Sequence, residues 1–150
     1  MSLTSRVAGP ALLLSPVLVF VLALVLVLGA APAIAEDCPA KSTQMDDIID
    51  AINAAPGCDR AMKIFEACEF GASGDVQFGA AVEKKCEGDF LGRLTAPKKQ
   101  AYRHEMRVCD RKYRNESGTM YLSFTAFCRA EVARRYSRRA QKDTGPSKPR

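Results

Sequence analysis

The sequence contains no tryptophan, a single histidine and no Cys-x-x-Cys pair. A zinc site of the usual kind therefore lacks ligands, and His104 lacks the recognisable nucleophile and orienting acid that catalysis requires. No spacing of acidic residues resembles a calcium-binding loop. We therefore expect a protein that is not an enzyme and that binds no metal or cofactor.

The chain also lacks internal repeats, and no stretch alternates apolar and polar residues for long enough to predict a β-strand. What it has instead is a long apolar run near its start, six cysteines and several segments with helical periodicity. These three features determine the fold class that we expect.

The first 35 residues have the pattern of a secretory signal peptide. Arg6 supplies the positive charge, an apolar run follows from Ala11 to Ala31, and Ala33 and Ala35 occupy the −3 and −1 positions of an A-x-A cleavage site. We expect cleavage near Ala35 and a periplasmic or secreted protein, with membrane contact only through the signal peptide. An uncleaved anchor is the alternative, because the run is long enough to span a bilayer.

All six cysteines follow this segment: Cys38, Cys58, Cys68, Cys86, Cys109 and Cys128. An even number in a small exported chain predicts three disulfides, although free or mixed cysteines are the alternative. Folding the helices as hairpins favours Cys109 with Cys128 and Cys38 with Cys68, which leaves Cys58 and Cys86. Six cysteines allow fifteen pairings, and the sequence does not choose among them.

Helical periodicity predicts five helices, over residues 42–54, 59–70, 75–94, 95–113 and 119–139. In the last of them we expect Phe124, Cys128, Val132 and Tyr136 to face the core. We therefore predict an all-α fold, a small disulfide-stapled bundle of four to five helices. The helical domain would cover residues 36–140, followed by a disordered basic tail over 141–150.

The charge is divided along the chain. Residues 36–92 carry five basic and twelve acidic side chains, a net charge of −7, whereas residues 93–150 carry sixteen basic and five acidic ones, a net charge of +11. Such a distribution predicts an acidic and a basic surface that steer charged partners.

Two charged faces are the candidate binding sites. The basic face consists of Arg134, Arg135, Arg138 and Arg139. It could bind an envelope polyanion or be an ordinary solvated helix face. The acidic face consists of Asp46, Asp47 and Asp50, together with Glu66 and Glu69. It could receive a basic protein or be ordinary surface. Export argues against nucleic acid as the partner.

The segment CDRKYRNESGTMYLSFTAFCRAEVARRY resembles the end of the lysozyme-inhibitor LprI-like family of small exported bacterial proteins. Cys109, Ser117-Gly118-Thr119, Cys128 and Arg134 or Arg135 occupy the places of the family's cysteines, turn and basic pattern. The resemblance covers at most residues 86–139. The tryptophan that usually precedes the family's penultimate cysteine is absent, and serine replaces the second glycine of its turn.

The sequence is therefore consistent with two functions. The first is an exported, non-catalytic binding module that recognises a protein or an envelope polyanion. The second, which the resemblance implies, is an inhibitor of lysozyme-type cell-wall hydrolases. Because lysozymes are commonly basic, the acidic first half would then be the contact surface.

Overall fold

The computed structural model describes residues 37–144. The signal peptide predicted over residues 1–35, and residues 145–150 of the predicted tail, lie outside this part of the chain. All described residues belong to one compact unit.

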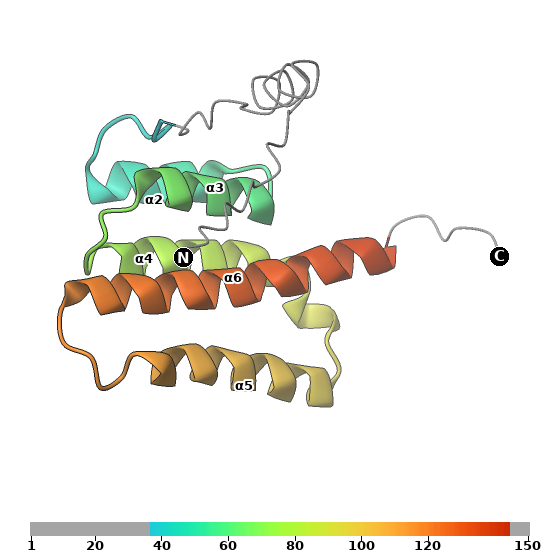
Figure 1. Ribbon diagram of the computed structural model, residues 1–150. Coiled ribbons are helices and arrows are strands. Elements are labelled where there is room, and N and C mark those ends of the chain that lie inside the picture. The colour runs from blue at the N-terminus through green and yellow to red at the C-terminus, as the bar shows by residue number, and fades with distance from the viewer. Residues whose placement is uncertain (1–36, 145–150) are drawn as a thin grey trace, which may run out of the picture. The chain divides into compact units, whose positions relative to one another are not determined.

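The described chain is all-α, as predicted, and contains no strand. Its elements are α2 (Met45–Ala54), α3 (Cys58–Cys68), α4 (Asp75–Glu87), the short 3₁₀ helix η1 (Leu91–Arg93), α5 (Ala96–Lys112) and α6 (Thr119–Thr144). α2 packs against α3 and α4, α6 crosses the middle of the bundle, and α5 lies at its edge against α6 (Figure 1).

Two predicted helix ends are wrong. The helix expected over 75–94 stops at Glu87, and the chain turns so that Phe90 enters the core beside Tyr102, with ring centroids 5.1 Å apart. The last helix continues to Thr144 instead of ending near Arg139. Ser137 and Gln141 donate hydrogen bonds to the carboxylate of Asp89, which holds this extension against the rest of the bundle.

The centre of the fold is a parallel seam between α4 and α6, whose first residues lie at the same end of the bundle (Figure 1). Side chains meet along it at a nearly constant sequence offset. Ser123 donates to Asp75 at 2.6 Å, Arg129 bonds Glu83 at 2.8 Å, and Ser137 donates to Asp89. This repeated offset indicates that the two helices run together over most of the length of α4.

Asp75 is fully buried at the first residue of α4. Besides the Ser123 hydroxyl, its carboxylate accepts backbone N–H groups from Phe70 at 2.8 Å, Gly71 at 2.9 Å and Ala72 at 3.3 Å. A buried carboxylate is tolerated when hydrogen bonds replace its hydration. Asp75 therefore ties the α3–α4 loop to the beginning of both seam helices.

Two disulfides connect helices, a third ties the segment before α2 to α3, and no cysteine of the described chain is free. Cys38 pairs with Cys68, Cys58 with Cys86, and Cys109 with Cys128. The first and third are the pairings that the hairpin geometry favoured. The Cα atoms of Cys109 and Cys128 are 5.6 Å apart, within the usual range for a disulfide.

The inward face of α6 differs from the expected one. Val132 is buried, but Phe124 is 41% exposed, so the prediction that it faces the core is wrong. Small residues line the seam instead: Ser123, Ala126, Ala130, Ala133 and Ser137. Their size allows α4 and α6 to approach closely. A prediction based on the spacing of large apolar residues misses a packing face made of small ones.

Gly79→Ala tests this close approach. A Cβ at residue 79 would lie 2.9 Å from the Ala126 Cβ and 3.1 Å from the Ala126 carbonyl oxygen. Overpacking costs about 1–3 kcal/mol and outweighs the gain of about 1 kcal/mol in helix propensity. We expect the variant to lose about 1 kcal/mol of unfolding free energy in a urea titration. Gly92→Ala, which meets nothing within 4 Å, is the control and should stay within about 0.5 kcal/mol. A Gly79 variant as stable as the wild type would contradict the close approach of α4 and α6 at this residue.

Candidate functional site

The basic face predicted on α6 is largely engaged in ion pairs with the rest of the protein. Arg134 Nε and Arg138 Nε both donate to Asp59 Oδ1, at 2.9 Å and 2.7 Å. Arg134 Nη1 also lies 3.3 Å from carboxylate oxygens of Glu66 and Glu131. Two of the four predicted arginines therefore hold α6 against α3.

The other two predicted arginines lie toward α5. Arg135 donates to Glu105 at 2.8 Å, and the hydroxyl of Tyr136 donates to the other oxygen of the same carboxylate at 2.7 Å. The guanidinium of Arg139 lies 5.3 Å from the centroid of the Tyr136 ring. Since three of the four arginines have carboxylate partners, this face is poorly suited to a polyanion.

Asp59 is the carboxylate on which the α3–α6 ion pairs converge. Partial burial alone would raise its pKa, but the hydrogen bonds from Arg134 and Arg138 outweigh burial and lower the pKa below its ordinary value of 3.8. The ionised form of Asp59 therefore contributes to the stability of the fold.

The acidic face predicted on α2 is different, because it stays open to solvent. Asp46 and Asp50 are exposed, and neither forms an ion pair within residues 37–144. Asp47 is half-buried and accepts a hydrogen bond from the Ser42 hydroxyl just before the helix. Two of the three predicted aspartates are therefore available to a basic partner.

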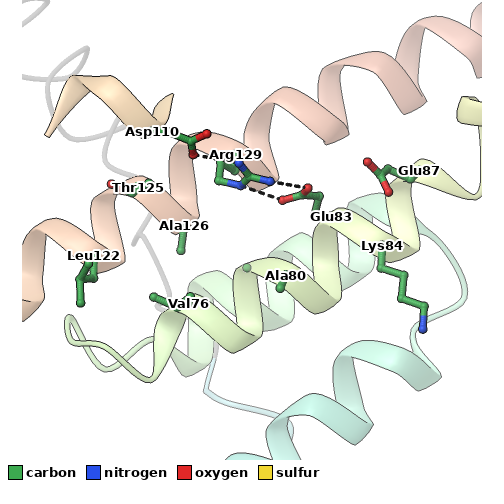
Figure 2. A pocket seen from close by; sticks show the side chains of 11 residues that line it. Val76, Ala80, Glu83, Lys84, Glu87, Asp110, Leu122, Thr125, Ala126 and Arg129 are labelled. Carbon is green, nitrogen blue, oxygen red and sulfur yellow. Dashed lines mark hydrogen bonds and ion pairs between the residues drawn. The ribbon is translucent and has the colours of Figure 1, made fainter. Parts of the chain in front are cut away.

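A half-open groove of about 380 Å³ follows the seam (Figure 2). Gly79 and Ala126 belong to its lining, so the groove exists because the seam residues are small. Val76 and Leu122 line one part of the groove. The bonded side chains of Glu83, Arg129 and Asp110 line another part (Figure 2).

Three charged groups that line the groove, Arg129, Glu83 and Asp110, bond one another, whereas Glu87 bonds a residue outside it. Arg129 donates to Glu83 at 2.8 Å and 3.1 Å and to Asp110 at 2.8 Å, and Glu87 accepts the Tyr102 hydroxyl at 2.8 Å. Burial raises the pKa of Glu83, and Arg129 opposes the rise by stabilising the ionised form. Among the described residues, no cluster of three or more His, Cys, Asp or Glu side chains could hold a metal ion.

A third charged surface, which the sequence reading missed, lies on α5. Lys99, Arg103, Arg107 and Arg111 recur every four residues and form a band along the helix, here called the α5 basic stripe. Three of them are exposed and Lys99 is half-buried. None forms an ion pair with a carboxylate of residues 37–144, in contrast to Arg129, Arg134 and Arg135. At 1.5 Å per residue the stripe spans about 18 Å.

The signal for this stripe was present in the sequence as an i, i+4 repeat of basic residues. The dense group of arginines near residue 135 concealed it, because local charge density does not reveal which cations have acidic partners. Only the packing of α3 and α5 against α6 separates paired from unpaired arginines.

Comparisons with known proteins found no matching family model, no similar curated protein and no similar solved structure. The resemblance to the lysozyme-inhibitor LprI-like family therefore stays a prediction.

No helix within residues 37–144 combines the length and the apolar character needed to cross a bilayer.

Asp59→Asn tests the ion pairs that occupy the α6 arginines. A lowered folded-state pKa stabilises the protein above the ordinary pKa and loses this contribution as the pH falls through the folded-state pKa. The variant should therefore be less stable than the wild type near pH 7, by less than about 1 kcal/mol because the site is half-exposed. Thermal unfolding curves of the two proteins should converge as the pH falls below 3.8 and through the lowered folded-state pKa of Asp59. A stability difference independent of pH would contradict the role given to ionised Asp59.

Proposed function

We propose that the protein is an exported, non-catalytic binding module that recognises an anionic partner in the cell envelope through the α5 basic stripe. The observation that carries this proposal is the contrast between two sets of cations. The arginines of α6 are mostly paired with carboxylates, whereas the stripe cations have no carboxylate partner in the described chain. Unpaired cations repeated along one helix attract polyanions, since no internal ion pair must first be broken.

The disulfides support the exported location. Three disulfides are typical of proteins in an oxidising extracellular or periplasmic compartment. The finer part of the proposal is that the signal peptide is cleaved after Ala35, so that the mature chain begins at Glu36.

The arrangement of the helices also separates the basic surface from the acidic one. α5 packs on α6, whereas α2 packs on α3 and α4. The helices that carry the stripe and the exposed aspartates, α5 and α2, therefore lie on opposite sides of the α4–α6 pair (Figure 1). A molecule with separated charges turns its basic side toward an anionic surface and its acidic side away.

Neutralising the stripe tests the proposal. We expect the triple variant R103Q/R107Q/R111Q, in the oxidised chain from Glu36 onward, to leave heparin-agarose at much lower salt than the wild type. Attraction between exposed charges weakens as salt screens it, so the salt needed for elution reports the number of cations that contact the polyanion.

The matched control removes the same number of positive charges elsewhere. Lys41, Lys63 and Lys84 are exposed and lie outside α5, and K41Q/K63Q/K84Q should elute close to the wild type. Equal shifts for both triple variants would show that only net charge matters and would contradict the stripe as the site.

The second candidate is inhibition of a lysozyme-type hydrolase, and one observation favours it. Asp46 and Asp50 on α2 are exposed and have no ion-pair partner in the described chain, so a basic protein can approach them. Under this proposal α2 is the contact surface and the α5 basic stripe faces away from the enzyme.

Lysis of a bacterial cell-wall suspension by lysozyme tests the second candidate. The oxidised chain should slow lysis in a saturable way, and D46N/D50N should abolish the effect because the basic enzyme loses its acidic counterpart. E116Q/D143N, which changes the net charge equally at exposed positions away from α2, should inhibit like the wild type. Absence of inhibition by the folded wild-type protein would remove this candidate for the lysozyme tested.

A further inference from the structure

The tip of the α5–α6 hairpin exposes more apolar surface than a solvated turn requires. Met120 and Leu122 are each 47% exposed, and Phe124 is 41% exposed, all within the first two turns of α6. Met120 and Phe124 are four residues apart and share one face of α6, whereas Leu122 lines the groove beside Val76. Single exposed apolar residues are ordinary, but apolar patches mark interaction sites.

Two tyrosines extend this patch. The rings of Tyr113, Tyr121 and Phe124 form a mutual cluster, with centroid separations of 5.6–5.9 Å. Tyrosine has an apolar ring and a polar hydroxyl, and it is enriched at the boundary between lipid and water. We call Tyr113, Met120, Tyr121 and Phe124 the aromatic tip.

Cations surround the aromatic tip. The ammonium of Lys112 lies 5.0 Å from the centroid of the Tyr113 ring. Arg111 and Arg114 are exposed on either side of Lys112 and Tyr113, and Arg111 is also the last residue of the α5 basic stripe. Apolar and aromatic side chains bordered by basic ones are characteristic of surfaces that lie on anionic membranes.

We propose that the aromatic tip inserts into the interfacial region of an anionic lipid bilayer while the α5 basic stripe lies against the lipid headgroups. This inference rests on the proposed function and names the anionic partner as a lipid surface. It also goes beyond the expectation that only the signal peptide contacts a membrane. Each basic residue near such a surface strengthens binding roughly fivefold, and burial of apolar side chains adds to this.

The acidic residues do not oppose this orientation. Asp46 and Asp50 lie on α2, which packs on α3 and α4 and not on α5. Nearer the tip, Asp110 is paired with Arg129 at 2.8 Å, and Glu116 is outnumbered by Arg111, Lys112 and Arg114. The side of the bundle that faces the lipid is therefore basic.

Vesicle sedimentation tests the proposal with the oxidised chain from Glu36 onward. Wild-type protein should bind vesicles of phosphatidylglycerol mixed with phosphatidylcholine and should not bind pure phosphatidylcholine. M120Q/F124Q should bind the anionic vesicles about tenfold more weakly, because two exposed apolar side chains are lost. Val76→Gln alters an equally exposed apolar residue on α4, outside the tip, and should bind like the wild type.

Insertion can also be observed directly, because the chain contains no tryptophan and a single introduced one reports its own surroundings. The emission of F124W should shift to shorter wavelength on anionic vesicles and stay unchanged on neutral ones. V76W should show no shift on either. Since residues 76 and 124 are both exposed, neither substitution disturbs the core.

The outcomes separate this inference from the proposed function. Retention on heparin without binding to anionic vesicles would overturn the lipid proposal and leave the stripe as a site for a soluble or polymeric anion. Vesicle binding that M120Q/F124Q does not weaken would overturn the role of the tip. If the folded wild-type protein binds neither heparin nor anionic vesicles, both proposals are overturned.

Discussion

The close parallel contact of α4 and α6 is the constraint on which the rest of this fold depends. It requires small residues on both helices, Gly79 on one and Ala126 on the other, because a Cβ at residue 79 would lie 2.9 Å from the Ala126 Cβ. Asp75 aligns the beginning of the seam through Ser123, and Asp89 holds its far end through Ser137. The groove beside the seam is a consequence of the same small residues.

The position of α6 also determines which charged side chains on the neighbouring helices form ion pairs. By placing α6 between α3 and α5, the seam brings the basic second half of the chain against carboxylates of both neighbours, so that Asp59 and Glu105 receive Arg134, Arg138 and Arg135. Four arginines of the basic half, Arg129, Arg134, Arg135 and Arg138, are therefore held in internal ion pairs. The outer faces of α5 and α2 carry charge without such partners, and these faces support the proposed functions.

Helical periodicity and cysteine count were sufficient to predict the fold class. They did not predict the end of α4, because Phe90 leaves the helix to reach an aromatic group that includes Tyr102 and Tyr136. They also misplaced Phe124, since the face of α6 that packs is defined by small residues and not by large ones. Nor did they show that Arg134, Arg135 and Arg138 have carboxylate partners, because those partners come from distant parts of the sequence.

The most direct test of the account is a residue-by-residue map of where an anionic ligand binds. A ¹H–¹⁵N correlation spectrum of the oxidised chain, titrated with a short sulfated oligosaccharide, would report every backbone amide at once. The account predicts that the largest shifts fall on α5, from Lys99 to Arg111, while the amides around Arg134 and Arg138 change little. Shifts centred on residues 134–139 would contradict it, because they would show that the ion pairs to Asp59 and Glu105 open to admit the ligand.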